Sequence, residues 1–501
     1  MVSVTLKRRF KAFLLLIILF HSHSLLAEDG YRLWLRYKLI QDEELLKKYR
    51  QGIRSVITEG VSVTMQCARK ELDLGIQGLL GIDISGEDTL VDGTIIIGTY
   101  GPNTMLSEIL SPDETAPLGD EGFTILSKKL NDKKVIVISA LHDIGVLYGT
   151  FHFLKLLQTQ EDISNLNIES VPRIKIRMLN HWDNLDRTVE RGYSGFSIWN
   201  WHQLPEYIDP RYIDYARANA SIGINGASVT NVNANALALR TDYLYKVKAL
   251  ADVFRPYGIR VYLTARFSAP IELGKLGTSD PLDDEVQAWW RNKANEIYDL
   301  IPDFGGFLVK ANSEGQPGPQ NYDRTHAEGA NMLAQAVAPH GGIVMWRAFV
   351  YSNEEPDDRH KQANNEFVPL DGKFDENILI QVKNGAIDFQ PREPFHPLFG
   401  AMRKTQMMME FQITQEYLGQ GTHLVYLGPL FKEVLEADTY QEGPGSSVGK
   451  IVDGSLNNQN TTAIAGVANI GTDRNWTSHP FAQANWYAYG RLAWDYETSV
   501  A

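Results

Sequence analysis

Cysteine is nearly absent from this chain. Cys67 is the only one among 501 residues, which excludes an intrachain disulfide and a cysteine-based metal site. Glycine-rich phosphate loops are missing as well. Gly93, Gly98 and Gly101 lie around a strand-like run but form neither a GxGxxG nor a Walker pattern. The 12 histidines include no HExxH pattern, so we expect no metal and no cofactor.

Positive charge is also in short supply. Lys and Arg number 48 against 61 Asp and Glu, which gives a net charge of −13. A main nucleic-acid partner is therefore not expected, because phosphate binding requires a basic face. Apolar residues make up 44% and charged residues 22%, which is typical of a soluble globular protein. A chain of 501 residues is long enough for two or three domains.

Long apolar runs are confined to the N-terminus. The run from Phe13 to Phe20 follows a basic segment and precedes the small residue Ala27, which is the layout of a secretory signal peptide. The run is too short for a spanning helix of about 20 residues, and no second run of that length follows. We expect residues 1–27 to be a signal peptide, with no membrane span and export to the periplasm or the medium.

The remaining chain divides into two regions and a tail. Residues 28–168 contain strand-like runs at Thr94–Gly98 and Val135–Ser139 and a helix pattern from Val146 to Leu157. They predict a small N-terminal α/β domain. Residues 169–480 form the second region, and residues 481–501 are the tail.

Short apolar runs recur through the second region, separated by helix-length segments. Strands that alternate with helices pair in parallel, and eight such units over about 260 residues match the size of a TIM barrel. The predicted fold class is therefore α/β, a (β/α)₈ barrel, with a doubly wound open sheet as the alternative. The eight runs are Ile174–Leu179, Ile222–Thr230, Ile259–Thr264, Gly306–Val309, Gly342–Trp346, Ile378–Val382, Met408–Thr414 and Leu424–Leu427.

Polar residues follow seven of these runs. Active-site residues of a barrel lie at the C-terminal ends of its strands. One polar residue after a strand is weak support, because strand ends are polar in any soluble protein, but seven sets together are stronger. In chain order they are His181, Trp182, Asp183 and Asn184; Asn231 and Asn233; Arg266; Lys310, Asn312 and Glu314; Arg347; Lys383, Asn384 and Asp388; and Glu416.

Three carboxylates among them, Glu314, Asp388 and Glu416, suit glycoside hydrolysis. That reaction needs one carboxylic acid for the leaving oxygen and a carboxylate on the opposite face of the sugar. The alternative for each is an ordinary surface acid.

Three cations, Lys310, Arg347 and Lys383, accompany the carboxylates. They either neutralise the acids or bind an anionic substrate, since Arg grips a carboxylate with two hydrogen bonds. A sugar acid as substrate explains acids and cations in one pocket. Trp182 either stacks on a sugar ring or packs as a core residue at the barrel mouth.

Several long segments resemble one family closely. They are MLNHWDNLDRTVERGYSGFSIW (178–199), SVTNVNAN (228–235), GFLVKANSEGQPGP (306–319), QVKNGAIDFQPREPFHPLFG (381–400), FQITQEYLGQGTH (411–423) and NWTSHPFAQANWYAYGRLAWD (475–495). The chain is similar through them, from about residue 28 to residue 495, to the xylan-degrading α-glucuronidases of glycoside hydrolases. Motifs this long and unusual make a chance match implausible.

The resemblance implies a fold and an activity. The family has a small N-terminal α/β domain, a (β/α)₈ catalytic barrel and a C-terminal helical domain. Its members remove glucuronic acid or its 4-O-methyl form, joined by an α-1,2 bond to the non-reducing-end xylose of xylo-oligosaccharides, with inversion. Glucuronic-acid-substituted xylo-oligosaccharides are therefore the expected partners. The alternative is a non-catalytic fragment that binds uronate-bearing oligosaccharides.

The resemblance also implies roles for individual residues. Glu314 matches the general acid, and Asp388 and Glu416 match the pair that activates water. Lys310, Arg347 and Lys383 match the cations that hold the uronate carboxylate. Trp182 matches the aromatic wall of the sugar site, and Val232 falls where the 4-O-methyl group is accepted.

One departure from the family concerns the C-terminus. Residues 481–501 match only the start of the helical domain, so most of that domain is expected to be missing from this chain. In the family this domain contributes to dimer contacts, which leaves a homodimer in doubt.

Overall fold

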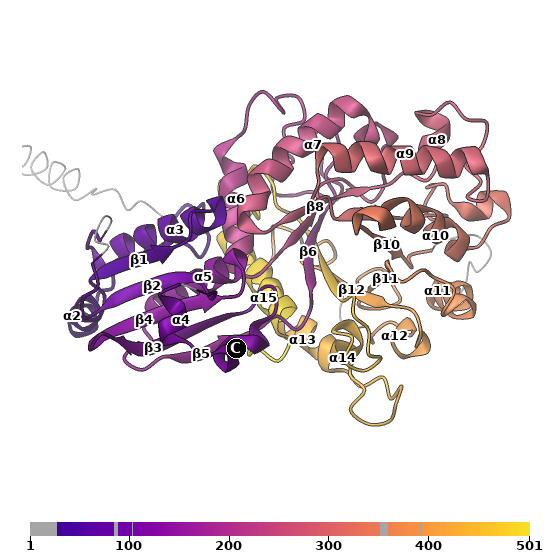
Figure 1. Cartoon of the computed structure of the whole chain (residues 1–501). Helices are drawn as coiled ribbons and strands as arrows, with labels where there is room; N and C mark the ends of the chain where they lie inside the picture. Colours follow the sequence, from indigo (N-terminus) through magenta and orange to yellow (C-terminus); the bar gives the residue numbers. More distant parts are fainter. Residues whose placement is uncertain (1–27, 85–88, 103, 351–358, 391–392, 501) are drawn as a thin grey trace, which may run out of the picture.

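The computed structural model describes residues 28–84, 89–102, 104–350, 359–390 and 393–500. The expected signal peptide at residues 1–27 lies outside them. Figure 1 shows a small sheet domain, in indigo and violet, beside a larger barrel, with helix α15 in yellow running between them. The division of the chain at residues 168 and 480 stays a prediction.

The small domain is built on a mixed five-stranded sheet. Its order is β1-β2-β4-β3-β5, with β1, β2 and β4 parallel and β3 antiparallel to both β4 and β5. The predicted runs at Thr94–Gly98 and Val135–Ser139 are confirmed as the neighbouring interior strands β2 and β4, which are rich in β-branched residues. The strands are β1 (Ser55–Glu59), β2 (Thr94–Thr99), β3 (Phe123–Leu130), β4 (Lys133–Ala140) and β5 (Asn167–Ser170).

Helices cover both faces of this sheet. α3 begins at the N-cap Ser62, whose side chain accepts a hydrogen bond from the backbone N–H of Met65, and ends at Gly81 in the left-handed region. It packs with α5 against one face, while α4 packs against the other. The predicted helix from Val146 to Leu157 is confirmed within α5. The helices are α2 (Glu43–Gly52), α3 (Val63–Leu80), α4 (Leu106–Ile109) and α5 (Asp143–Gln158), with 3₁₀ turns η1 (Pro112–Glu114) and η2 (Ala116–Leu118).

Eight parallel strands close the barrel, which confirms the predicted fold class. Every neighbouring pair is parallel, and the closing pair joins β13 to β6. The strands are β6 (Ile176–His181), β7 (Gly226–Ser228), β8 (Arg260–Thr264), β9 (Gly306–Val309), β10 (Ile343–Arg347), β11 (Ile378–Lys383), β12 (Met407–Gln412) and β13 (Ala463–Ala468).

The eighth strand is not where the sequence predicts it. The run Leu424–Leu427 is irregular, and the side chain of Leu424 is 70% exposed. The eighth strand is β13, whose sequence is AIAGVA. Alanine and glycine have weak strand preference, so this segment gives little apolar signal. This segment forms the eighth strand because its small side chains fit beside Met178 and Met408, which are bulky residues of the barrel interior.

An outer ring of helices surrounds the barrel. α15 packs against both β6 and β13, which is the position of an eighth outer helix. The helices are α6 (Pro210–Ser221), α7 (Thr241–Phe254), α8 (Ala269–Glu272), α9 (Asp284–Leu300), α10 (His326–Val337), α11 (Arg359–Phe367), α12 (Leu398–Ala401), α13 (Gly428–Glu436), α14 (Val448–Val452) and α15 (Gln483–Trp494). The 3₁₀ turns are η3 (Ala236–Leu239), η4 (Arg255–Tyr257), η5 (Pro319–Tyr322), η6 (Ala338–His340), η7 (Val368–Leu370) and η8 (Pro480–Ala482).

Trp494, the last residue of α15, joins the two bodies. Its indole packs edge-on against Tyr148 at 5.3 Å and lies 6.0 Å from Phe123, both in the small domain. Its indole N–H donates to the Ser170 hydroxyl at 3.0 Å. The guanidinium of Arg177, on barrel strand β6, lies over the same indole at 5.0 Å. One side chain therefore belongs to the packing of both bodies.

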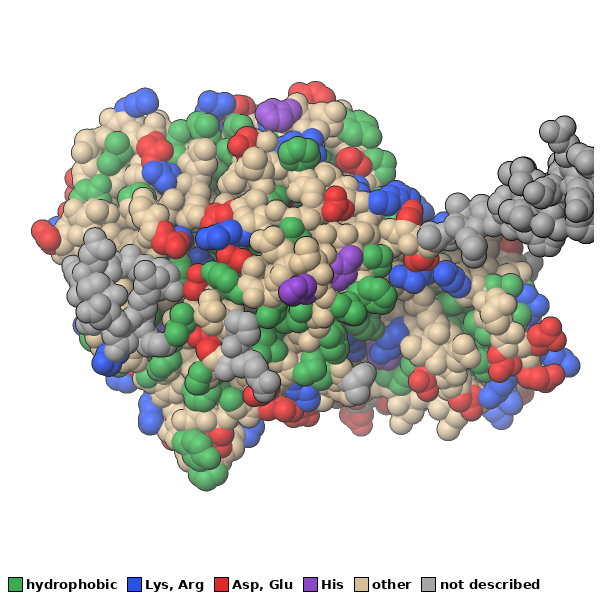
Figure 2. Space-filling view, turned by 180° about the vertical axis from the view of Figure 1, so that it is seen from behind, with side chains coloured by type: hydrophobic (Ala, Val, Ile, Leu, Met, Phe, Trp, Pro, Cys, Tyr) green, Lys and Arg blue, Asp and Glu red, His purple; other side chains and the backbone are tan. Residues whose placement is uncertain are grey.

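The surface carries both signs of charge. Acidic and basic side chains are intermingled on the rear face (Figure 2), so the negative excess is not gathered into a single acidic patch on that side. Within the described ranges, no helix combines the length and apolarity needed to cross a membrane.

Gly306 is a fold-determining position at the start of β9. Its φ is +132°, and a side chain there would collide with the backbone carbonyl of Ile343 on β10. We expect Gly306→Ala to lower the free energy of unfolding by about 3 kcal/mol or more, through backbone strain and overpacking. Urea unfolding measures this. Gly277→Ala is the matched control, since a methyl group there meets open space. Equal stability of the two variants would contradict the assignment.

Candidate functional site

Three cations converge at the mouth of the barrel. Lys310 follows β9, Arg347 ends β10 and Lys383 ends β11. Lys310 and Arg347 lie two residues after the inward-facing Leu308 and Met345, and Lys383 lies four residues after the inward-facing Leu379. Strand alternation therefore turns all three inward. Their charged groups surround the ring of Phe349, whose centroid lies 5.5 Å from the Lys310 nitrogen, 5.3 Å from Arg347 and 3.1 Å from Lys383. The structure thus brings the three predicted cations together, all buried.

Arg347 is held by a carboxylate that sequence reasoning missed. Its Nε and Nη2 donate to the two oxygens of Glu410 on β12, at 2.8 and 2.6 Å. Gln381 on β11 also donates to Glu410. Burial alone would lower the pKa of Arg347, but the ion pair with Glu410 outweighs it and raises that pKa. The signal for Glu410 was present in the sequence, as a lone acid at an inward position of the apolar strand MMMEFQ.

Lys310 connects a carboxylate to a neighbouring amide. Its ammonium pairs with Glu314 and donates to the side-chain oxygen of Asn233 at 2.8 Å. Burial, followed by the charge of Arg347, lowers the pKa of Lys310. Glu314 itself is reachable from solvent, since its side chain is 46% exposed. The predicted acid therefore sits at the rim of the mouth, above a buried cation.

Lys383 pairs with the second predicted carboxylate. Its ammonium contacts Asp388, which also accepts a hydrogen bond from the Tyr417 hydroxyl at 2.7 Å. Burial lowers the pKa of Lys383 to about 8. Burial tends to raise the pKa of Asp388, but the charge of Lys383 overcomes this and holds it below the ordinary value. Asp388 is therefore ionised at neutral pH.

Glu416 occupies a different environment from Asp388. Gln412 donates to its Oε2 at 2.7 Å, and the Nε of Arg191 lies 3.2 Å from its Oε1. The Glu416 side chain is only 5% exposed. Burial, assisted by the charge of Asp388, raises the pKa of Glu416, although Gln412 and Arg191 oppose the shift. The two carboxylates of the predicted pair thus titrate in opposite directions from their ordinary values.

Two of the three carboxylates stand on strained backbone. Glu314 has φ +48° and Asp388 has φ +40°, both in the left-handed region that residues other than glycine rarely adopt. Such conformations cost about 1–3 kcal/mol each and cluster at functional sites. The backbone conformation of the loops after β9 and β11 is therefore imposed by the surrounding structure and not by the intrinsic φ/ψ preference of these two residues.

Trp182 and Val232 lie in the apolar lining of the barrel interior. Both are buried in the same cluster as Phe389, whose ring lies 6.5 Å from that of Trp182. The indole N–H of Trp182 is buried and finds no hydrogen-bond acceptor among the described residues. Phe389 in turn lies 4.5 Å from the Lys383 ammonium, so the apolar cluster adjoins the cations. The roles of Trp182 as an aromatic wall and of Val232 as the methyl-accepting position stay predictions.

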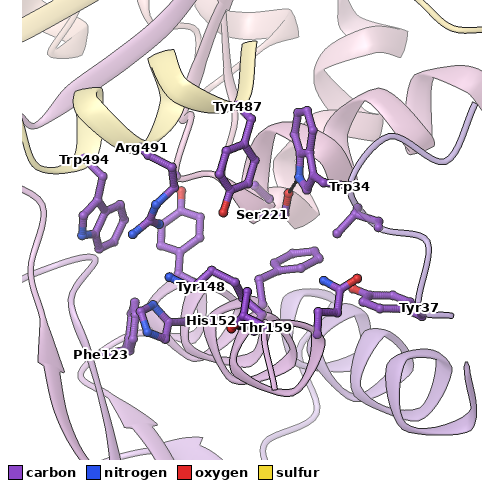
Figure 3. Close-up of a pocket in the computed structure, with 16 residues that line it drawn as sticks. Trp34, Tyr37, Phe123, Tyr148, His152, Thr159, Ser221, Tyr487, Arg491 and Trp494 are labelled. Atoms are coloured by element: carbon purple, nitrogen blue, oxygen red, sulfur yellow. Dashed lines mark hydrogen bonds between the residues drawn. The ribbon is translucent and has the colours of Figure 1, made fainter. Parts of the chain in front are cut away.

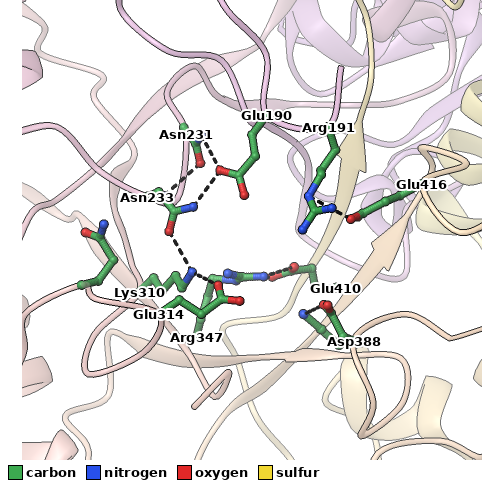
Figure 4. A network of polar contacts seen from close by, with 12 residues as sticks. Glu190, Arg191, Asn231, Asn233, Lys310, Glu314, Arg347, Asp388, Glu410 and Glu416 are labelled. Atoms are coloured by element: carbon green, nitrogen blue, oxygen red, sulfur yellow. Dashed lines mark hydrogen bonds and ion pairs between the residues drawn. The ribbon is translucent and has the colours of Figure 1, made fainter. Parts of the chain in front are cut away.

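A further acid, Glu190, faces the cations from the loop after β6. Its Oε2 accepts hydrogen bonds from Asn231 at 2.8 Å and from Asn233 at 2.7 Å. Asn233 in turn accepts from Lys310, which links Glu190 to the cation cluster (Figure 4). Sequence reasoning did not select Glu190 or Arg191, because a loop position gives no periodic signal and their partners come from distant strands.

The mouth thus combines a floor of buried cations with carboxylates around it. Figure 4 shows Glu314 and Asp388 on either side of Arg347, with Glu416 beside Arg191 farther along the rim. Such a site can hold a carboxylate and move protons on its neighbours. Among the residues that the structure covers, no group of three or more His, Cys, Asp or Glu side chains is arranged to hold a metal ion.

Two family profiles match the chain. A profile of the glycosyl hydrolase family 67 middle domain matches residues 156–476, and one of the glycosyl hydrolase family 67 N-terminus matches residues 33–153. Together they cover most of the small domain and the barrel.

Two curated relatives extend this comparison. The chain is 42% identical over 504 residues to alpha-glucuronidase A of Emericella nidulans, covering 97% of this chain and 58% of that protein. It is 41% identical over 500 residues to alpha-glucuronidase of Hypocrea jecorina, covering 96% of this chain and 58% of that protein. The chain therefore spans less than two thirds of the length of these relatives.

Among solved structures, a GH138 enzyme targeting pectin rhamnogalacturonan II aligns with a TM-score of 0.51 at 14% identity. The alignment covers 88% of this chain and 50% of the other. At this identity the likeness concerns the fold alone.

Glu410 is expected to stabilise the protein strongly, because its loss leaves the buried Arg347 without its ion-pair partner. We expect Glu410→Gln to lower the free energy of unfolding by about 3–5 kcal/mol. Glu314→Gln, the same change at a half-exposed ion pair, should cost less than about 1 kcal/mol. Urea unfolding followed by tryptophan fluorescence compares the two. A smaller loss for Glu410→Gln than for Glu314→Gln would refute the central role of this pair.

Proposed function

Because the chain belongs to glycosyl hydrolase family 67, we propose that it is an inverting α-glucuronidase. Its substrate is (4-O-methyl)glucuronic acid joined by an α-1,2 bond to the non-reducing-end xylose of a xylo-oligosaccharide. The single observation that carries this proposal is the cation cluster, in which three buried cations surround Phe349 and pair with the carboxylates of Glu314, Glu410 and Asp388. A substrate with one carboxylate and one glycosidic bond needs both sets.

The cations bind the uronate. Lys310 and Lys383 hold Glu314 and Asp388 in the unliganded site. An entering substrate carboxylate displaces Glu314 from Lys310 and shares the Lys383 ammonium, which has three N–H donors, with Asp388. Arg347 stays fixed by Glu410, which leaves its Nη1 for the substrate, since only Nε and Nη2 are engaged by Glu410. The site is thus charged and preorganised before the sugar arrives.

Glu314 acts as the general acid. It stands at the rim, where the glycosidic oxygen of a sugar held below would lie, and its half-exposed side chain reaches the leaving xylose. When the uronate takes over Lys310, Glu314 loses its cation and gains a negative neighbour. Both changes stabilise the protonated form of Glu314, which is the form that gives its proton to the leaving oxygen.

Asp388 and Glu416 activate the water. Their charges act on one another, since Asp388 raises the pKa of Glu416. Asp388 stays ionised beside Lys383 and Tyr417 and orients the water, and Glu416 accepts the water's proton. An inverting reaction places this water on the face opposite the acid, which requires the acid and the base to be about 6.5–9.5 Å apart.

The first experiment measures product release. We expect the purified chain to release (4-O-methyl)glucuronic acid from aldobiouronic and aldotriouronic acids, with the β-anomer appearing first by NMR. Asp388→Ala should abolish release. Glu314→Gln should retain most activity on an aryl α-glucuronide with a good leaving group, which needs little protonation. A folded protein that binds these acids without releasing product would instead be a non-catalytic binder.

Arg191 should set the acidic limb of the pH profile. Its charge lowers the pKa of Glu416, so removing it lets that pKa rise and moves the acidic limb of kcat/KM to higher pH. Because Arg191 is 58% exposed, we expect Arg191→Gln to shift the limb by only roughly 0.2–0.7 pH units. Arg191→Lys should leave the limb in place. A limb that moves to lower pH in Arg191→Gln would rule out Glu416 as the titrating base.

A further inference from the structure

A second cavity lies at the opposite end of the barrel, where it meets the small domain. Its floor includes Ala220 and Ser221, at the end of α6, and Gly223, in the connection from α6 to β7. These residues therefore lie at the N-terminal end of the strands. The volume is about 250 Å³. Figure 3 shows the cavity between two helices, with Tyr148 and His152 from α5 on one side and Tyr487, Arg491 and Trp494 from α15 on the other.

The charged side chains that line this cavity are all cationic. Its ionisable lining apart from tyrosines consists of His152, Lys155 and Arg491, and no Asp or Glu lines it, although the chain has a net charge of −13. In the described part of the chain, no acceptor or carboxylate contacts the side-chain nitrogens of Lys155 or Arg491. By contrast, nearby Arg177 pairs with Glu121. Unpaired cations in a partly buried site are costly.

The cations also destabilise one another. Burial, and then the charge of Arg491, lowers the pKa of Lys155 to about 8, although the charge of Glu161, outside the lining, opposes the shift. Burial lowers the pKa of His152 to about 3, with further contributions from Lys155 and Arg491. An anion among these groups would remove this repulsion. His152, neutral at physiological pH, would then supply a hydrogen bond.

The walls of the cavity are aromatic. Trp34, Phe123, Tyr148, Tyr487 and Trp494 all line it. The rings are fixed by contacts with one another: Trp34 lies edge-on to Tyr487 at 5.2 Å, and Trp494 lies edge-on to Tyr148 at 5.3 Å. Such walls favour a flat ring or the apolar face of a sugar. Pockets for drug-sized ligands measure about 300–1,000 Å³, so this smaller cavity suits a single ring.

We propose that this cavity is a binding site for a single-ring carboxylate, whose anionic group is held by Lys155 and Arg491 and whose ring packs against the aromatic walls. The same chemistry occurs in a sugar acid and in an aromatic acid. The site is separate from the barrel mouth, and it does not depend on the activity proposed there.

Calorimetric titration of the full chain tests this site with two carboxylates. The probes are D-glucuronate and benzoate, each compared with a neutral counterpart, glucose and benzyl alcohol. We expect at least one carboxylate to bind about 10-fold or more tightly than its counterpart, and to lose about 10-fold or more in Lys155→Gln and in Arg491→Gln, because each removes a charge-assisted hydrogen bond. Which probe binds identifies the source of the ligand.

Control variants separate this site from others. Lys155→Arg keeps the charge and should keep the affinity, and Lys47→Gln removes an exposed cation on α2 and should change nothing. The two test substitutions lie on different helices. Circular dichroism shows whether either variant fails to fold, and if one does, the affinity of the other variant still tests the proposal. Failure of both carboxylates to bind, binding equal to that of the neutral counterparts, or affinities unchanged in both variants would overturn the proposal.

Discussion

The balance of charge among the buried cations at the floor of the barrel mouth constrains the carboxylates that lie above them. Arg347 lies between Lys310 and Lys383, out of reach of bulk water, and the fully buried Glu410 contacts it directly. Taking such charges out of water costs several kcal/mol per ion, which an ion pair repays only with good geometry and further hydrogen bonds. Two hydrogen bonds from Arg347 and one from Gln381 supply that geometry. The remaining two cations pair with the acids at the rim.

The same balance accounts for the division of labour among the carboxylates. Glu410 faces a permanent cation in the floor and is fully engaged. Glu314 and Asp388 face lysines, whose ammonium groups are point charges that another carboxylate can take over or share. Among the cations of the described residues, only Arg191 pairs with Glu416, and its side chain is 58% exposed. Position relative to the cations therefore distinguishes four otherwise similar acids, one structural and three available for chemistry.

Much of this architecture could be predicted from the sequence, because buried parallel strands are continuous apolar runs. Seven of the eight barrel strands contain or overlap such a run, and the residues after them include all three candidate carboxylates. The eighth strand escaped because the segment Ala463–Ala468 is held by its neighbours on both sides rather than by its own preference. The apolar run Leu424–Leu427 looked more like a strand, yet no strand of the described residues pairs with it, and its backbone bonds to the Asn485 side chain instead.

The parts of the site that escaped prediction have a common physical reason. Glu190, Arg191 and Tyr417 act through partners that are remote in sequence, such as Asn233 and Asp388. Only closure of the barrel brings them together. Glu410 differs, since a charge in an apolar strand is itself a signal that a partner must exist. Its partner, however, could be named only once β10 and β12 were placed on either side of β11.

The position of Trp494 has a consequence for synthesis of the protein. The small domain emerges from the ribosome first, yet its apolar surface at Tyr148 and Phe123 is covered by a residue near the other end of the chain. At about 5–20 residues per second, that surface stays open for tens of seconds. During this interval the nascent small domain exposes the apolar surface around Tyr148 and Phe123. That exposed surface is of the kind that chaperones bind.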